Sequence, residues 1–129
     1  MNILDQKSAL IYFIEDLDIE MIGSILDPDV KCLNESKQDF LRIFANCFDL
    51  FRRKGNSLLV RTPGRCKFSA NNGESFIFSG DVSKDYIEIN ILTKEGRVIG
   101  IHECYCFSDD MADRSGHKVY IDSKRGCPF

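Results

Sequence analysis

Several features that would point to a particular function are missing from this sequence. Positive charge is not in excess, because 17 basic and 20 acidic residues give a net charge of −3 over 129 residues. Nucleic-acid binding depends on neutralising several phosphates, so we expect no nucleic-acid partner. Apolar runs are too short to cross a membrane, and the N-terminal stretch carries acids where a signal peptide would be basic or apolar. We therefore expect no membrane association and a cytoplasmic location.

Glycine and cysteine also lack the spacing of known functional motifs. There is no G-x-G-x-x-G, no G-x-x-x-x-G-K-[ST] and no G-x-S-x-G, so neither a phosphate-binding loop nor a nucleophile elbow is predicted. The six cysteines show neither a C-x-x-C knuckle nor the dense spacing of a secreted disulfide scaffold. We expect reduced thiols, with Cys47 acting as a small apolar residue on a helix face, and no cofactor.

Helical periodicity is present up to about residue 55. An apolar stripe at three- and four-residue spacing predicts helix from about residue 8 to residue 26. Its members are Leu10, Ile14, Leu17, Met21 and Ile25. Asp18 is suited to cap a second short helix, which predicts a bend between residues 16 and 18. The stretch ends at Asp27, because the residue before Pro28 is pushed out of the helical region.

A second helix is predicted from Ser36 to Lys54, and its ends are well marked. Ser36 followed three residues later by Asp39 resembles a capping box, and Gly55 provides the stop. One face of this helix carries mainly phenylalanine, an aromatic stripe that is far more often core than ligand site. The apolar residues of that face are Phe40, Phe44, Cys47, Phe48 and Phe51.

After Asn56 the apolar period changes to two, which indicates strands. The predicted strands are 57–62, 65–69, 75–81, 86–93, 97–107 and 118–122. Short turns between strands favour antiparallel pairing, and the apolar face of such a sheet needs helices to cover it. The sequence therefore predicts the α+β class, with N-terminal helices packed on an antiparallel sheet. We expect one domain over residues 1–129, with an irregular C-terminal extension from about residue 108.

The turn Lys94-Glu95-Gly96 predicts the register of the last long hairpin. A three-residue loop pairs Thr93 with Arg97 and places the core-side residues opposite one another. The resulting pairs are Ile91 with Ile99, Ile89 with Ile101, and Ile87 with Glu103.

The opposite face of that hairpin is predicted to be less polar than a solvated sheet surface. It carries Tyr86, Leu92, Val98 and Cys104. Exposed apolar patches commonly mark association surfaces, so a homodimer through the sheet is expected. The alternative is that the C-terminal tail, with Val119, Tyr120, Ile121 and Phe129, folds back over this face.

The element order, together with the phrase FIEDLDIEMIGSILDPDV, resembles the nuclear transport factor 2-like, or SnoaL-like, superfamily over about residues 5 to 107. The resemblance implies a cone-shaped, cystatin-like roll whose helices close over a strongly curved sheet and leave an apolar pocket. It also implies frequent homodimers, but it selects no reaction, because the superfamily includes isomerases, dehydratases, cyclases and transport adaptors. The aspartate-and-tyrosine set of the ketosteroid isomerases has no match here, so no catalytic residue is carried over.

Glu103 is a charged residue at a predicted core position, since the register places it inward among apolar residues. A carboxylate in an apolar cavity can act as a general acid or base, and Tyr12 could reach in from the first helix. The pocket would be lined by Phe40, Phe44, Phe48, Ile89, Ile101 and Tyr105. The alternative is that Glu103 lies at a solvated rim or bonds to a neighbouring strand.

A metal site is a weaker possibility at His102-x-Cys104-x-Cys106, because thiolate and imidazole are the ligands that zinc prefers. Further ligands could come from Cys66, His117 and Cys127. Same-face residues of a strand stand about 7 Å apart, which is too far for comfortable tetrahedral coordination. Ordinary thiols are therefore favoured over zinc.

Three functional hypotheses follow. The leading one is a binding domain for a small apolar or carbonyl-containing molecule held between the helices and the concave sheet. The second is a lyase or isomerase with Glu103 as general base. The third is a protein-interaction or dimerisation domain without a ligand, because the phenylalanines are bulky enough to fill a small core.

Overall fold

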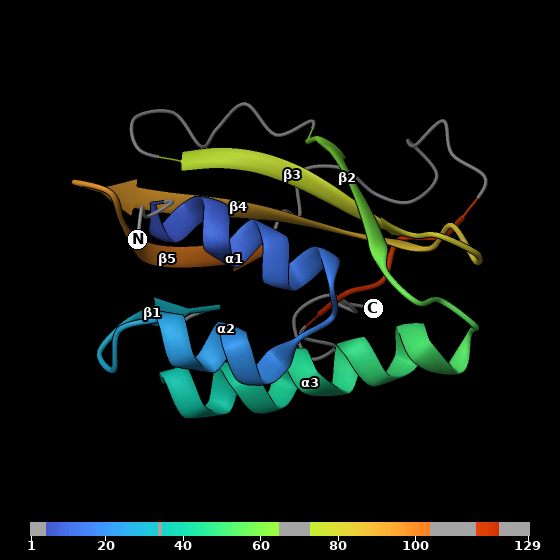
Figure 1. Ribbon diagram of the computed structural model, residues 1–129, viewed down its shortest axis with the longest axis horizontal. Coiled ribbons are helices and arrows are strands. Elements are labelled where there is room, and N and C mark those ends of the chain that lie inside the picture. Colours follow the sequence, from blue (N-terminus) through green and yellow to red (C-terminus); the bar gives the residue numbers. More distant parts are fainter. Residues whose placement is uncertain (1–4, 34, 65–72, 104–115, 122–129) are drawn as a thin grey trace, which may run out of the picture.

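The computed structural model describes residues 5–33, 35–64, 73–103 and 116–121. Two short helices, α1 (Gln6–Glu15) and α2 (Ile19–Ile25), precede the long helix α3 (Lys37–Arg53) (Figure 1). The chain bends at Leu17, whose φ is 56°, and the Asp18 carboxylate then accepts a hydrogen bond from the Met21 amide at 3.1 Å. The predicted bend and its cap are confirmed.

Helix α3 begins and ends within one residue of the prediction. Ser36 Oγ accepts a hydrogen bond from the Asp39 amide at 3.2 Å, which satisfies one of the free amides of the first turn. Gly55 follows the helix with a φ of +92°, a left-handed conformation that glycine adopts without strain. Local sequence signals therefore fix both ends of this helix.

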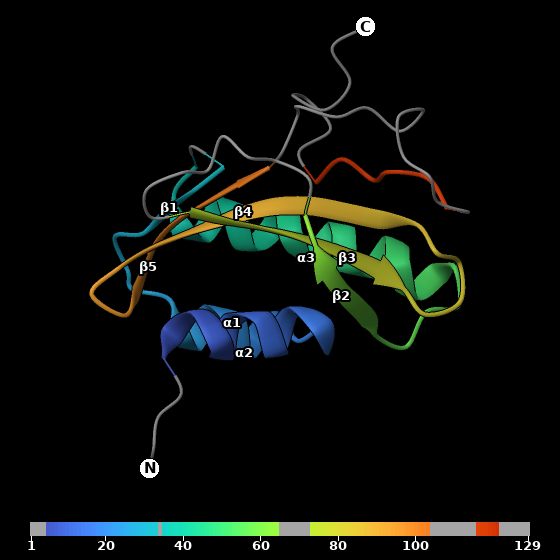
Figure 2. The same ribbon diagram turned by 90° about the horizontal axis from the view of Figure 1, so that it is seen from above.

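Within the described residues, five strands form one mixed sheet in the order β1-β5-β4-β3-β2. They are β1 (Lys31–Cys32), β2 (Leu59–Pro63), β3 (Gly73–Gly80), β4 (Tyr86–Lys94) and β5 (Arg97–Glu103). Strands β2 to β5 pair antiparallel as expected, but β1 pairs with β5 in parallel. The α+β class is confirmed, and the prediction of a purely antiparallel sheet is wrong because a two-residue strand carries no periodic signal. The sheet is bowed rather than strongly curled, so strong curvature is not confirmed (Figure 2).

Two of the predicted strands, 65–69 and 118–122, are not among the described strands of this sheet. The predicted strand 65–69 lies outside the described residues. For the predicted strand 118–122, the structure describes residues 118–121, and among these Lys118 forms a single parallel bridge to Tyr86. Residues 116–121, called the C-terminal segment below, lie beside the start of β4 and are red in Figure 1.

The predicted register of the β4–β5 hairpin is wrong. Lys94 pairs with Arg97, and the loop is the two-residue turn Glu95-Gly96, in which both residues have positive φ (53° and 81°). Thr93 then pairs with Val98 and Leu92 with Gly100, so the strands return to regular pairing through a bulge in β5 whose extra residue is Ile99. As a result Ile91 faces Ile101, and Ile89 faces Glu103.

The bulge changes which residues of β5 face the core. Val98, predicted on the outer face, is buried with the core residues, whereas Ile99, predicted in the core, is 46% exposed. An extra residue in one strand of a pair shifts the alternation by one position, and this explains both exchanges. Ile101 and Glu103, beyond the bulge, face inward as predicted.

The core lies between the helices and the inner face of the sheet. It joins α1, α2 and α3 to β3, β4 and β5 through the buried side chains of Leu10, Ile14, Ile22, Phe40, Phe44, Phe48, Phe51, Phe76, Phe78, Ile87, Ile89, Ile91 and Ile101. On the outer face, Ile77, Tyr86 and Glu88 are also fully buried, so the exposed apolar patch predicted there is not present at Tyr86 or Val98. Homodimerisation through that face stays a prediction.

Candidate functional site

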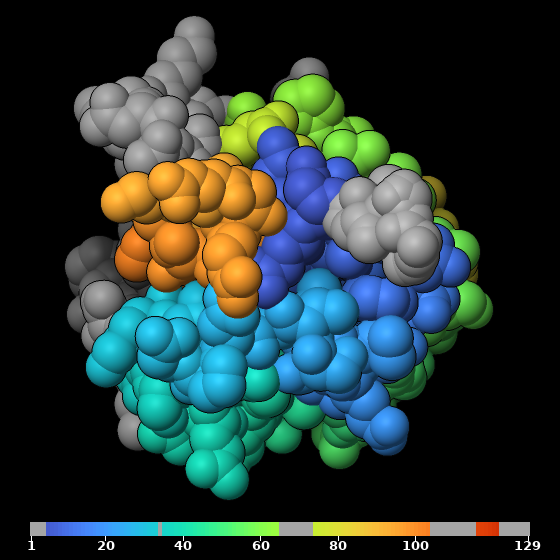
Figure 3. Space-filling model, turned by 60° about the vertical axis from the view of Figure 1, so that its left-hand side comes forward, coloured from blue at the N-terminus to red at the C-terminus, as the bar shows by residue number. Residues whose placement is uncertain are grey.

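A groove opens at the end of the molecule where the β4–β5 hairpin meets the loop between α2 and β1 (Figure 3). Its volume is about 380 Å³, which is within the range of small-ligand sites. One wall comes from the hairpin, the other from the loop, and the residues that line it are Asp27, Asp29, Val30, Lys94, Glu95, Arg97, Val98 and Ile99. Its position follows from the bulge, which turns Ile99 outward at this place.

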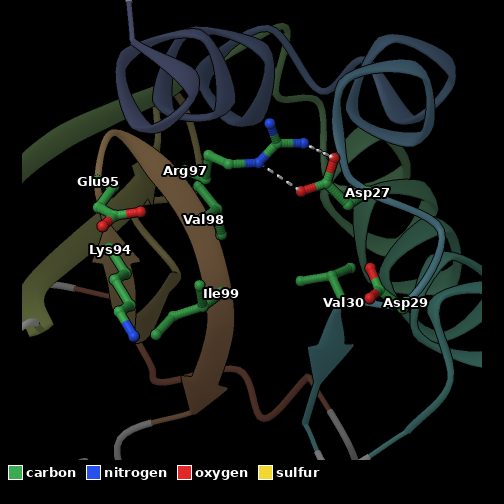
Figure 4. A pocket seen from close by; sticks show the side chains of 8 residues that line it. All are labelled: Asp27, Asp29, Val30, Lys94, Glu95, Arg97, Val98 and Ile99. Atoms are coloured by element: carbon green, nitrogen blue, oxygen red, sulfur yellow. Dashed lines mark hydrogen bonds and ion pairs between the residues drawn. The ribbon is translucent and has the colours of Figure 1, made fainter.

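An ion pair and a glutamine hold the two walls together. The Arg97 guanidinium reaches from β5 to the Asp27 carboxylate through two hydrogen bonds, one of them 3.1 Å long (Figure 4). These bonds raise the pKa of Arg97 above its usual value. Gln6 accepts a hydrogen bond from the Val98 amide and donates one to the Ile25 carbonyl, which ties α1 and α2 to β5.

The remaining charged groups around the groove are available to a ligand. Among the described residues, Asp29, Lys94 and Glu95 form no hydrogen bond or close ion pair through their side chains, although the charge of Asp29 also contributes to the raised pKa of Arg97. Figure 4 shows Asp29 beside Val30 on the loop side, and Lys94 and Glu95 on the hairpin side, where the Ile99 side chain is directed toward Lys94. The groove therefore offers charge of both signs beside an apolar surface.

The residues predicted to line an interior pocket all lie in the core where they are described. Phe40, Phe44, Phe48, Ile89 and Ile101 are each 0% exposed. The rings of Phe40 and Phe44 lie 5.0 Å apart, and those of Phe44 and Phe48 lie 4.6 Å apart. Tyr105 lies outside the described residues. These phenylalanines pack against each other as core residues do, and ligand binding among them stays a prediction.

Glu103 is buried, but its carboxylate bonds to the protein itself. It is 6% exposed, and its Oε2 atom accepts a hydrogen bond from the Ile121 amide at 2.7 Å. Tyr12 is 60% exposed on α1, so its side chain does not reach into the core as a pairing with Glu103 would require. The structure thus fits the alternative in which Glu103 bonds to a neighbouring segment.

This contact makes a prediction for two substitutions. Glu103→Ala should lower the free energy of unfolding by about 2–3 kcal/mol, because the buried Ile121 amide loses its acceptor. Glu103→Gln keeps an acceptor oxygen and should cost only about 1 kcal/mol. Urea unfolding of both variants measures the difference, and equal losses would show that the hydrogen bond is not the source of the effect.

The structure offers no support for the metal prediction within its described part. No group of three or more potential ligands lies together among those residues. His102 is exposed on β5, His117 belongs to the C-terminal segment, and Cys66, Cys104, Cys106 and Cys127 lie outside the described residues.

Two other cysteines, Cys32 and Cys47, are free and buried. Burial raises the pKa of each thiol to about 12, and the nearby Glu103 adds to this effect at Cys47. A thiol with so high a pKa stays protonated and unreactive at neutral pH. Cys47 therefore acts as the small apolar core residue that its place on the helix predicted.

Comparisons with known proteins bear on the fold alone. No protein-family model matches the sequence, and no curated protein matches it. The structure is similar to the crystal structure of a de novo designed protein with a curved β-sheet, with a TM-score of 0.51 and 14% sequence identity. The match covers 79% of this chain and 85% of the designed one. None of the helices in the described part of the chain has the length and apolarity needed to cross a lipid bilayer.

Proposed function

We propose that this protein is a binding domain whose ligand occupies the groove between the α2–β1 loop and the β4–β5 hairpin. The observation that carries the proposal is the set of three charged side chains, Asp29, Lys94 and Glu95, without ion-pair partners among the described residues around the exposed Ile99. Isolated polar groups beside an apolar surface are typical of small-molecule sites. The leading hypothesis from the sequence, a small-molecule-binding domain, is kept, and its site moves from the core to the surface.

The lining favours a cationic ligand with an apolar body. Three acids line the groove against two bases, and Arg97 already neutralises Asp27. Asp29 and Glu95 then outnumber Lys94, while Val30 and Ile99 offer apolar contact. A small amine with a branched alkyl group and a carbonyl matches this arrangement.

L-leucinamide is a suitable probe, because it carries an ammonium, an isobutyl group and a carbonyl. We expect it to shift the backbone amide resonances of Asp29, Val30 and Ile99 in a saturable NMR titration. Asp29→Asn should weaken binding about three- to fivefold, since a charge–charge contact at an exposed site is worth about 1 kcal/mol or less.

A surface variant and an uncharged compound serve as controls for nonspecific binding. Asp49→Asn removes an exposed acid from α3 and should leave the affinity unchanged. N-acetyl-leucinamide, which lacks the positive charge, should bind more weakly than leucinamide. If neither compound shifts the groove resonances, or if Asp49→Asn has the same effect as Asp29→Asn, the proposal is wrong.

We also propose, on element order alone, that the chain is a member of the nuclear transport factor 2-like superfamily with a cone-shaped sheet. The support is the succession of two short helices, one long helix and a meander that ends in the long β4–β5 hairpin. This proposal assigns no chemistry, because members of one fold differ in activity.

A further inference from the structure

Buried polar side chains gather at one place in this fold. Within the described part of the chain, the buried polar or charged residues are Asn56, Asp85, Glu88, Glu103 and Lys118. All except Asn56 meet where the C-terminal segment lies beside the start of β4 (Figures 1 and 2). Three of them are carboxylates of the domain body, and the fourth is the lysine of the segment.

The segment is bound to β4 through main-chain hydrogen bonds on both sides of one parallel bridge, Tyr86 with Lys118. The Tyr86 amide donates to the His117 carbonyl at 3.0 Å, and the Val119 amide donates to the Tyr86 carbonyl at 2.6 Å. Within the described residues, β5 pairs with β4 as far as Ile89, and the segment bridges to the same strand at Tyr86. Such main-chain pairing is how many proteins bind an extended peptide at a sheet edge.

The three carboxylates make this binding specific. Asp85 Oδ1 accepts a hydrogen bond from the His117 amide at 3.0 Å, and Glu103 Oε2 accepts one from the Ile121 amide. Glu88 Oε1 lies 3.8 Å from Lys118 Nζ, and both side chains are fully buried. A positive charge close to a buried carboxylate stabilises its ionised form, so the strip favours a strand that brings a lysine to this position.

Neighbouring residues of the segment complete a simple recognition pattern. Lys118 lies against Glu88, and its ammonium is 5.3 Å from the centre of the Tyr120 ring. Ile121 joins the hydrophobic core, and the half-buried Val119 packs against it. The pattern is therefore lysine, apolar, aromatic, apolar in an extended chain.

We propose that Asp85, Tyr86, Glu88 and Glu103 form a strand-acceptor strip that binds an extended, lysine-containing peptide of a partner protein. The C-terminal segment is its resident occupant, and a partner peptide with the same pattern replaces it. The strip shares no residue with the groove at Asp29.

The test uses the full-length Lys118→Glu variant and a fluorescent, capped peptide with the sequence of residues 116–121. Charge reversal places Lys118→Glu against Glu88, which releases the segment and vacates the strip. The variant should then bind the peptide at least about tenfold more tightly than the wild type, whose strip is occupied. A peptide with glutamate in place of its lysine should bind about a hundredfold more weakly, as expected for breaking a buried ion pair.

A matched surface variant and a second measurement keep the outcome clear. Arg42→Glu reverses an exposed charge on α3, and this variant should bind the peptide as the wild type does. A folded Lys118→Glu variant that binds neither peptide, or binds both equally, overturns the proposal. If Lys118→Glu does not fold, excess peptide should speed hydrogen exchange at the Val119 and Ile121 amides of the wild type. Unchanged exchange would also overturn it.

Discussion

Replacing Asp85 by alanine is expected to lower the free energy of unfolding by about 2–4 kcal/mol. The side chain is 7% exposed and holds two parts of the chain, because Oδ1 accepts from the His117 amide and Oδ2 lies 2.6 Å from Lys54 Nζ. Lys54 is 46% exposed, so solvent screens the ion pair and most of the loss should come from the amide that loses its acceptor. Denaturant unfolding at neutral pH measures the change.

The same residue should make stability depend on pH. Burial alone would raise the pKa of Asp85, but the hydrogen bond from the His117 amide and the contact with Lys54 outweigh it and hold the pKa below its usual value. The unfolded chain therefore takes up this proton first as the pH falls. The stabilisation by Asp85 is complete above about pH 5 and is lost progressively below about pH 4.

Asp85→Asn is the matched variant for this effect. It keeps an acceptor for the His117 amide but has no titrating group, so its stability should fall less steeply than that of the wild type between pH 5 and pH 3. Asp49→Asn on the surface of α3 should retain the wild-type slope. If the wild type and Asp85→Asn lose stability in parallel over this range, the lowered pKa does not contribute to folding.

Elements that depend on neighbouring residues could be predicted from the sequence. The Asp18 cap, the Ser36 cap and the Gly55 stop each satisfy backbone groups within a few positions, so their chemistry is visible in a short stretch of sequence. The apolar stripe of α3 likewise gave the buried face of that helix correctly. These features explain why the helices and the α+β class could be predicted.

Structural features that depend on residues far apart in the chain could not be predicted from the sequence. Strand β1 exists because two residues pair with Gly100 and Ile101 far along the chain. A two-residue turn takes the place of the predicted three-residue loop, and a bulge at Ile99 follows it; together these two changes move Ile99 from the predicted core to the edge of the groove. Glu103 accepts a hydrogen bond from the Ile121 amide, and the sequence gives no signal for such a contact to a main-chain group.

The residues of the groove could not be predicted as a site for the same reason, because they come from two segments that are distant in the sequence. Asp27 and Asp29 could be read only as the end of a helix, and Lys94 and Glu95 only as a turn. A signal was present in the charges that both segments carry, but nothing in the sequence placed the two segments side by side. Their approach depends on Gln6 and Arg97, whose partners Val98, Ile25 and Asp27 come from three different elements.

Asn56→Ala should destabilise the protein by about 3–5 kcal/mol, because one buried amide group serves four hydrogen bonds. Asn56 is 4% exposed. Its Nδ2 donates to the Phe51 carbonyl and to Ser83 Oγ, both at 2.9 Å. Its Oδ1 accepts from the Val82 amide at 2.8 Å and the Ser83 amide at 2.9 Å. The side chain thus joins the end of α3 to the β3–β4 turn, and thermal and denaturant unfolding measure its effect.

Gly80→Ala provides an independent check on this residue. A Cβ atom at Gly80 would lie 2.4 Å from Asn56 Oδ1, and the three nearest heavy atoms all belong to the Asn56 side chain. The substitution should therefore displace Asn56 and cause a large loss in the wild type. In the Asn56→Ala background that obstacle is gone, so Gly80→Ala should cost at least about 1 kcal/mol less than it does alone. Additive losses would mean that Gly80 is needed for a reason other than contact with Asn56.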